Sequence, residues 1–513
     1  MPTYLSPGVY VEEVDSGSRP IEGAGTAVAA FVGLAERGPA NEPVLITNWS
    51  QFTEAFGGFI EGSYLAHSVY GYFLNGGGAA YVVRVGADRA GPTPSTAVGE
   101  LTGGGEARVG AYRITALEAG PRGDELSVEV AAPGEGQPED AFKLIVRRGD
   151  NAVEEFDGLV TRRGRQNAVT VVNSQSTQIR LEEATTGGAL QRPDPGTASL
   201  SGGTAASSNG HRLSPEDYVG DSADRTGFGG LEAIDTVTMV SVPDLMAAYQ
   251  RGMIDVEGMQ AVQLAMIAHC ELMGDRVAIL DPPPGLNAQQ IREWRVDKAG
   301  YDSKQAALYW PWVKVFDPAS GQNIFVPPSG HMAGVWARSD AGRGVHKAPA
   351  NEVLRGVVSL ELNITKSEHD LLNPEGINCI RSFPGRGVRV WGARTLSSDP
   401  AWRYLNVRRL FNYLEKSILD GTDWVVFEPN DEALWAKIRR TIASFLVMEW
   451  RKGSLFGSTP AQAFYVKCDH ETNPAEAVDL GQVICEIGVA PVKPAEFVVF
   501  RLSQFSGGTS LVE

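Results

Sequence analysis

The sequence predicts a multi-domain α/β (α+β) protein into which an all-β unit is inserted. Three observations lead to this fold class. Apolar strands alternate with amphipathic helices in both the first and last parts of the chain, short β-type runs separated by turn residues fill 91–230, and 513 residues exceed what one hydrophobic core needs. The expected division is an N-terminal arm (1–22), a middle α/β domain (23–90 and 231–374), an inserted β-rich domain (91–230), a further α/β domain (375–490), and a C-terminal strand and arm (491–513).

The first α/β segment contains three predicted strands. These are the apolar runs 26–34, 44–47 and 80–85. Asn48 or Ser50 is placed to cap a helix that ends at Gly57, and Ser63 opens a second helix that ends at the glycines from Gly76 onward. The alternation of strands and helices predicts a layer of helices packed on a sheet.

The insertion has a different pattern, without a predicted helix. Its expected strands are 111–115, 125–130, 142–147, 168–172 and 177–181. A stretch rich in Gly, Ser, Ala and Thr at 186–210 is expected to be a flexible surface loop.

The α/β pattern returns near residue 236. Residues 236–243 and 276–280 are predicted strands, and 257–273 is a predicted helix with one apolar face. Asn287 and Gln290 have the spacing of a capping box and predict the start of a further helix.

The last third contains two strongly amphipathic helices. One runs over about 407–420 and stops at Gly421, and the other runs over 430–452, with Asn430 as its expected N-cap. The expected strands of this part are 424–429, 463–469, 482–490 and 495–505. The N-terminal residues 1–22 are too short to bury their own apolar side chains, so they are expected to dock on another surface.

Charge and cysteine content exclude several classes of protein. The net charge is −17 and the pI is near 5.0, which argues against binding nucleic acid over the whole surface, although a local basic patch stays open. The sequence lacks a signal-peptide pattern and an apolar stretch of membrane-spanning length. Cys270, Cys379, Cys468 and Cys485 form no C-x-x-C motif, so reduced thiols in a cytoplasmic protein are expected.

Candidate catalytic and metal sites are weak. Asp281 follows an apolar strand, as a magnesium-binding aspartate does in P-loop proteins, but the required phosphate loop is missing and a turn residue is the simpler reading. Ser329 lies near His331 in a proline-rich stretch that reads as a loop and not as a nucleophile elbow. Cys468 and His470 would supply only two metal ligands. No catalytic, cofactor-binding or metal-binding residue is therefore predicted.

Seven arginines fall between 381 and 409, together with Trp391 and Trp402. Two interpretations stay open for this segment. The arginines form intrachain ion pairs, each of small value, or they form a charged seam between subunits, since Arg and Trp are typical interface anchors. The candidate seam residues are Arg394, Arg403, Arg408 and Arg409.

Several long segments in order resemble the contractile tail sheath family of phages, R-type bacteriocins and phage-like injection systems. They are YLSPGVYVEE (4–13), FVGLAERGPANEPVLITNWSQFTEAFGG (31–58), FLNGGGAAYVVRV (73–85), VPPSGHMAGVWARSDAGRGVHKAPAN (326–351), VWGARTLSSDPAWRYLNVRRL (390–410), VFEPNDEALW (426–435) and APVKPAEFVVFRLSQ (490–504). The resemblance covers both ends of the chain and most of the α/β portion, whereas 91–230 matches only loosely.

The resemblance implies a structural subunit without a cofactor and without enzymatic activity. It places 375–490 in an inner domain and 91–230 on the outside, and it gives the two arms the role of adding strands to the sheets of neighbouring subunits. The implied arm residues are Val9, Tyr10, Val11, Phe497, Val499 and Leu502. A helix of the inner domain touches the tube in this family, so the candidate contacts on 430–452 are Lys437, Arg439 and Arg440.

The implied partners follow from the same family. They are further copies of the chain in a helical sheath of six-fold rings, an inner tube protein, and baseplate and tail-terminator or cap proteins. Assembly is expected in the bacterial cytoplasm, within a phage tail or tail-like particle, without nucleic acid and without membrane insertion. Two alternatives stay open: another self-assembling shell protein, and an α/β nucleotide-binding enzyme.

Overall fold

The computed structural model describes residues 20–86, 104–119, 126–134, 137–138, 140–149, 151–162, 164, 166–176, 178–183, 192–200 and 213–501. The chain divides into two compact units, of which one comprises Met1–Ala87 and Leu213–Glu513 and the other comprises Asp88–Arg212. The second unit is thus an insertion into the first. Its sequence boundary lies earlier than expected, because 213–230 belongs with the first unit.

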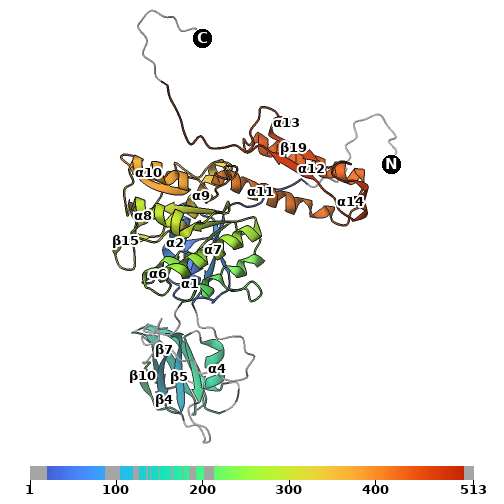
Figure 1. The fold of residues 1–513 in the computed structure, drawn as a ribbon. Coiled ribbons are helices and arrows are strands. Elements are labelled where there is room, and N and C mark those ends of the chain that lie inside the picture. Colours follow the sequence, from blue (N-terminus) through green and yellow to red (C-terminus); the bar gives the residue numbers. More distant parts are fainter. Residues whose placement is uncertain are drawn as a thin grey trace, which may run out of the picture. The chain divides into compact units, whose positions relative to one another are not determined.

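An eight-stranded sheet forms the centre of the first unit (Figure 1). Its order is β18-β17-β13-β12-β11-β1-β3-β2. The strands are β1 (Val28–Gly33), β2 (Val44–Ile46), β3 (Ala79–Arg84), β11 (Met239–Ser241), β12 (Val277–Leu280), β13 (Ala306–Trp310), β17 (Ile377–Phe383) and β18 (Gly387–Val390). The six inner strands are parallel and the two edge strands are antiparallel to their neighbours. This is the α/β fold that the sequence predicts.

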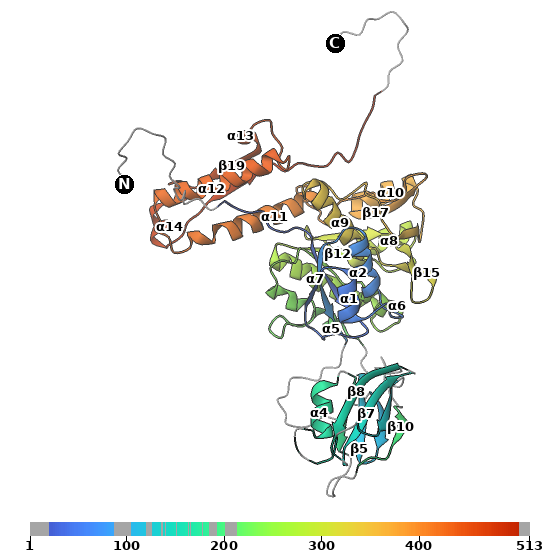
Figure 2. The same ribbon diagram turned by 180° about the vertical axis from the view of Figure 1, so that it is seen from behind.

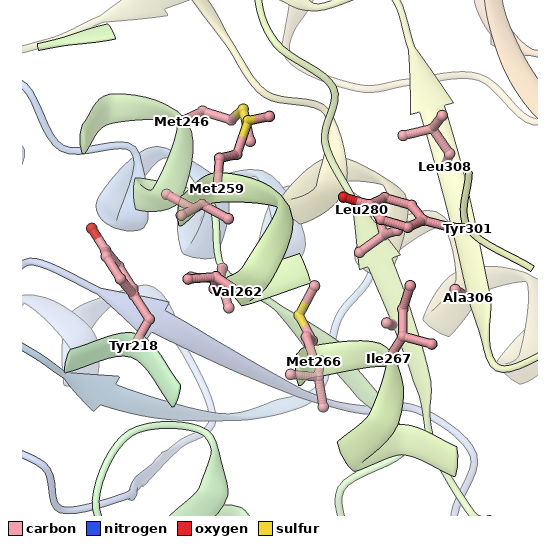
Figure 3. Close-up of a cluster of buried hydrophobic side chains, with 14 of the residues drawn as sticks. Tyr218, Met246, Met259, Val262, Met266, Ile267, Leu280, Tyr301, Ala306 and Leu308 are labelled. Carbon is pink, nitrogen blue, oxygen red and sulfur yellow. The ribbon is translucent and has the colours of Figure 1, made fainter. Parts of the chain in front are cut away.

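Helices cover both faces of this sheet. They are α1 (Trp49–Phe56), α2 (Leu65–Leu74), α5 (Pro215–Val219), α6 (Asp244–Gln250), α7 (Val256–Met273), α8 (Ala288–Glu293), α9 (Ser329–Arg343) and α10 (Lys366–Leu372). Successive strand residues point to opposite faces, so Ala29 and Phe31 of β1 join one core and Ala30 and Val32 join the other. Figure 3 shows the core that contains Ala30 and Val32, where Met259 and Val262 of α7 pack near Met246.

Two features of this unit correct the sequence analysis. Ser329 is not in a loop but begins α9, because the buried Asp281 carboxylate accepts hydrogen bonds from its backbone N–H at 2.9 Å and its hydroxyl at 2.5 Å. The strands β17 and β18 pair with the central sheet through β13, although residues from 375 onward were expected in the following domain. A three-stranded sheet of β14 (Val313–Asp317), β15 (Gln322–Val326) and β16 (Val357–Leu360) completes this part.

The inserted unit is built mainly from two antiparallel sheets, of order β10-β6-β7-β8 and β4-β5-β9. Its strands are β4 (Gly104–Val109), β5 (Tyr112–Ala119), β6 (Leu126–Ala131), β7 (Phe142–Arg148), β8 (Asn151–Leu159), β9 (Ile179–Glu183) and β10 (Gly196–Ser199). The expected strand at 168–172 is wrong, because Ala168–Gln175 forms the helix α4. The Asn167 side chain caps this helix at the Thr170 N–H, and Ala168 and Val172 are buried one turn apart.

The C-terminal part contains two long helices, α11 (Leu405–Thr422) and α12 (Glu432–Arg451), which lie alongside each other in both views (Figures 1 and 2). Asp431, not Asn430, caps α12. The short helices α13 (Pro460–Ala463) and α14 (Ala475–Asp479) flank the strands β19 (Phe464–Lys467) and β20 (Glu486–Val489), which form an antiparallel pair.

The expected strand at 424–429 is wrong, and the described part of the one expected at 495–505 is not a strand; residues 502–505 lie outside the described residues. Residues 424–429 form a turn between α11 and α12, because Phe427 has φ +66 and Asp423–Val425 is a 3-10 helix. Residues 495–501 form no strand, and none of the described residues supplies a strand to pair with them. A strand requires a partner for its backbone N–H and C=O groups, so the apolar alternation alone does not make one.

Candidate assembly interface

The β19–β20 hairpin packs on α12 and exposes its other face. Phe464 and Val466 of β19 and Ile487 of β20 lie against a core formed by α11 and α12. On the outer face, the ring of Tyr465 lies directly over Gly488, where a Cβ atom would clash with it. The sheet has only two strands, so each strand keeps one outer edge without a strand partner among the described residues. Such an edge is a template for pairing with another chain.

The chain that follows β20 is exposed and apolar. Phe497, Val498, Val499 and Phe500 are 73%, 67%, 78% and 85% exposed. Large apolar residues in succession are normally buried, and Val and Phe favour strands. The expected arm residues Phe497 and Val499 therefore lie free on the surface of a single chain. Val9, Tyr10, Val11 and Leu502 lie outside the described residues.

Glu496 fixes the point at which this apolar segment begins. The Arg394 guanidinium donates to both of its carboxylate oxygens, from Nε at 2.9 Å and from Nη2 at 2.7 Å. The Asn373 side chain donates at 2.8 Å and the Tyr404 hydroxyl at 3.3 Å. Burial alone would raise the pKa of Glu496, but the hydrogen bonds from Arg394 and Asn373 outweigh it and lower this pKa. The carboxylate stays charged and holds the root of the arm on the first unit.

Three of the four candidate seam arginines are engaged within the chain. Arg394 holds Glu496, as described, and Arg408 pairs with Glu415 at 3.1 Å. Arg409 pairs with Asp340 at 2.5 Å, where both side chains are 4% exposed. Arg403 is exposed. The intrachain interpretation therefore describes Arg394, Arg408 and Arg409.

The three candidate tube contacts on α12 differ in accessibility. Lys437 lies 4.1 Å from the centre of the Trp424 ring. Arg439 donates to the backbone carbonyl of Cys468. Arg440 is exposed. Their role in binding a tube stays a prediction.

A second apolar surface escaped the sequence analysis. At the turn between α11 and α12, Val426 is 64% exposed and Phe427 is 102% exposed. The Asn430 side chain donates to the Gln482 carbonyl at 2.9 Å, which holds this turn against the chain near Leu480, itself 76% exposed. The apolar run at 424–429 predicts a strand, so its exposure in a turn was not foreseeable from composition.

The candidate catalytic residues do not assemble into a site. Burial raises the pKa of Asp281 to about 7, and this carboxyl serves to cap α9 through Ser329. His331 is buried in α9 beside Gly71. Cys468 is buried whereas His470 is exposed beside Glu432. The part of the chain that the structure describes holds no group of three or more metal-binding side chains.

In the described segments, no helix combines the length and the apolar character needed to cross a bilayer.

Two models of known protein families match this chain. A model of the phage tail sheath protein central domain matches residues 225–396, and a model of the phage tail sheath C-terminal domain matches residues 397–505. The two matches together cover more than half of the chain.

Relatives of known type carry the same description. The tail sheath protein of Vibrio phage KVP40 is 27% identical over 262 residues, which cover 47% of this chain and 38% of that protein. The tail sheath protein of Burkholderia phage BcepMu is 25% identical over 521 residues, which cover 96% of this chain and 95% of that protein. The chain thus aligns with less than half of the first relative and with nearly all of the second.

Solved structures share the fold over almost the whole chain. The contracted helical sheath of the anti-feeding prophage is 23% identical with a TM-score of 0.58, over 98% of this chain and all of that one (100%). The contracted sheath of the PVC extracellular contractile injection system is also 23% identical, with a TM-score of 0.57, over 98% and 99% of the two chains. A crystal structure of a sheath tail protein from Desulfitobacterium hafniense, at 12% identity, gives 0.59 over 90% and 93%. These likenesses confirm the predicted fold class. The two family models, which together match more than half of the chain, show that the chain belongs to the phage tail sheath family.

Proposed function

We propose that this chain polymerises into a helical sheath around an inner tube and contracts to drive that tube through a target envelope. The observation that carries the proposal is that one chain has both an exposed apolar arm, 497–500, and a two-stranded sheet whose outer edges no other described strand occupies. An arm of one copy can add a strand to the sheet of another copy, where backbone hydrogen bonds supply affinity and alternate side chains set the register.

The energetics favour an arm that becomes ordered only on assembly. Full burial of Phe497, Val498, Val499 and Phe500 contributes roughly 6–12 kcal/mol. Ordering the backbone of four residues costs roughly 4–8 kcal/mol. Burial thus exceeds the ordering cost by roughly 2–4 kcal/mol where a surface is available, but the arm of an isolated chain has no such surface. The lattice of neighbouring copies supplies that surface.

The partners follow from the same reading. The structural neighbours are described as helical sheaths in a contracted state and as baseplate complexes. For this chain we propose further copies of itself, an inner tube and a baseplate as partners, with 1–22 and 491–513 as arms, 375–490 toward the tube and 91–230 outward. Assembly in a bacterial cytoplasm and the tube contacts Lys437, Arg439 and Arg440 are part of this proposal. The family is structural, and we propose no enzymatic activity.

Negative-stain electron microscopy of the purified chain across a concentration series tests the proposal. Hollow helical tubes wide enough to enclose a tail tube are the expected result. Closed or flat lattices would favour a different shell protein. The absence of tubes even with the cognate tube and baseplate would overturn the proposal.

A further inference from the structure

Two cysteines lie opposite each other at the end of the β19–β20 hairpin where the connecting segment 469–484 begins and ends. Cys468 follows the last residue of β19, and Cys485 precedes the first residue of β20. The register pairs Lys467 with Glu486, so the next step of the ladder places Cys468 across from Cys485. Both thiols are free.

The hydrogen-bond pattern of the hairpin defines the kind of pair. Ala490 donates its backbone N–H to the Ala463 carbonyl at 2.8 Å, so these two residues form a hydrogen-bonded pair. Pair types alternate along an antiparallel ladder, so Cys468 and Cys485, one step beyond its last pair, take the positions of a non-hydrogen-bonded pair, a type whose Cα atoms lie about 4.5 Å apart. Disulfides span Cα separations of about 4.4–6.8 Å. The pair has the spacing that a cross-strand disulfide requires.

The side chains meet on the same face of the hairpin. That face carries Phe464 and Val466, which pack toward α12, and Cys468 is fully buried there. Cys485 is half-buried against the same core. Both thiols therefore lie on the face of the hairpin that packs toward α12.

Neighbouring groups hold the backbone on both sides of the pair. The Asn473 side chain accepts from the Ile484 N–H at 2.6 Å and donates to the Ile484 carbonyl at 3.0 Å. It also donates to the Cys468 sulfur at 3.7 Å. Arg439 donates to the Cys468 carbonyl. Asn473 and Arg439 thus hold the backbone at Cys468 and next to Cys485.

We propose that Cys468 and Cys485 form a reversible disulfide that staples the loop end of the β19–β20 hairpin in an oxidising environment. The oxidant is a low-molecular-weight disulfide. The half-exposed Cys485, as a thiolate, attacks one sulfur of the oxidant and releases one thiol, which leaves a mixed disulfide. Cys468, as a thiolate, then displaces the second thiol. The protein loses two protons and two electrons, and the oxidant becomes two thiols.

The environment of the pair sets the rate of this reaction. Burial and the neighbouring Cys468 raise the pKa of Cys485 to about 12, and burial also raises the pKa of Cys468. Thiolates are scarce at neutral pH, so the pair stays reduced in a reducing compartment and oxidises slowly outside it. At pH values below the thiol pKa, each increase of one pH unit should accelerate oxidation about tenfold, because the thiolate fraction rises by that factor.

The staple would act on the surface that accepts the arm. The disulfide closes the segment 469–484, which includes α14 and the exposed Leu480. Closing a loop of this length restrains its opening. Its effect on assembly rests on the proposed function, because it requires the hairpin to be the acceptor of a neighbouring arm. The formation of the bond does not.

The test uses the full chain, reduced, freed of reductant and incubated with oxidised glutathione over a series of alkaline pH values. Intact mass and peptide mapping should show the loss of two hydrogen atoms and a cross-linked Cys468–Cys485 peptide, which dithiothreitol reverses. The buried Cys270 and Cys379 are internal controls and should stay thiols. Cys485→Ser should form no internal bond, and protease cleavage within 469–484 of the oxidised wild-type chain should slow by about tenfold or more.

Two results would overturn the proposal. One is a stable mixed glutathione disulfide at Cys485 without internal bond formation. The other is a wild-type chain whose Cys468 and Cys485 both stay thiols at a pH where Cys485 of the Cys468→Ser variant reacts with oxidised glutathione. Both readouts are independent of tube formation, so a correct disulfide with failed assembly would contradict the proposed function and not the staple.

Discussion

The central sheet of the first unit and the C-terminal hairpin differ in how far their strands are covered and paired within one chain. The eight-stranded sheet has helices on both faces, and its inner strands are buried on both sides. The β19–β20 hairpin has two strands, two edges that no other described strand pairs with, and a trailing apolar segment at 497–500. The first is complete within one chain, whereas under the proposed function other copies complete the second. That proposal assigns folding and assembly to different parts of the molecule.

The largest expected effect is the loss of assembly when the arm is altered. Val499→Asp places a charge in a segment that must be buried between copies, so tubes should not form. The matched control is Leu272→Asp on α7, because Leu272 is 75% exposed and Val499 is 78% exposed. Electron microscopy checks tube formation, and urea unfolding should change by less than about 0.5 kcal/mol for both variants. Normal tubes from Val499→Asp would remove the arm from the interface.

The next effect is on the free energy of unfolding, which should depend on the central sheet and not on the arm. Phe31→Ala in β1 removes a fully buried ring and should lower the free energy of unfolding by about 3–5 kcal/mol. Phe500→Ala, at a ring that is 85% exposed, should change it by less than about 0.5 kcal/mol. Urea unfolding followed by circular dichroism measures both. Similar losses for the two variants would contradict the division between a complete sheet and an incomplete one.

A pH effect of intermediate size should also come from the central unit. Burial, and to a lesser degree His67, lower the pKa of His331 from 6.5 to about 4. The unfolded chain then takes up a proton below pH 6.5 that the folded chain refuses, so stability falls as the pH drops from about 6.5 toward 4. At pH 5 this single group costs about 2 kcal/mol relative to pH 8.

Comparison with His331→Asn isolates that group. The difference in unfolding free energy between the variant and the wild type should shift by about 2 kcal/mol in favour of the variant between pH 8 and 5. Asp281 has the opposite pH dependence. Burial raises its pKa to about 7, so the stability that its neutral form contributes is lost as the pH rises from its unfolded pKa toward 7. This contribution is the same in the wild type and in His331→Asn and cancels in the difference. A constant difference would show that His331 takes up its proton in the folded state.

The smallest effect should come from the root of the arm. Glu496→Gln keeps the shape of the side chain but removes the charge that Arg394 binds through two hydrogen bonds. Losing charge assistance is worth on the order of 1.4 kcal/mol, so the concentration needed for tube formation should rise about tenfold. Sedimentation measures it, with Glu54→Gln, an exposed acid on α1, as the control. An unchanged threshold would show that the arm needs no anchor.

Local pattern was sufficient for most elements of the first unit. The capping box at Asn287 and Gln290 forms as expected, and the helix expected at 257–273 is α7, which begins at Val256. These signals depend on neighbours within a few residues, which a single sequence contains. The same reasoning failed at 168–172, where Val-rich residues form a helix because Asn167 caps it and the packing surface accepts one helical face.

The candidate site was only partly accessible to such reasoning. The exposed apolar run at Phe497 was recognisable, but Glu496 before it carried no sequence signal, since its partners Arg394, Asn373 and Tyr404 lie about a hundred residues away in the chain. Phe427 was placed in a strand because its neighbours are apolar, whereas its positive φ places it in a turn.

The sequence by itself determined the order of the elements, the separation of the inserted unit from the α/β part, the family, and the apolar character of the arm. Tertiary structure alone decided which arginines are used within the chain, which apolar residues stay exposed, and which cysteines face each other. Periodicity and capping are local properties of the chain. The pairing of Cys468 with Cys485 and of Arg394 with Glu496 depends on the register of strands and the docking of distant segments, for which a single sequence carries no measure of distance.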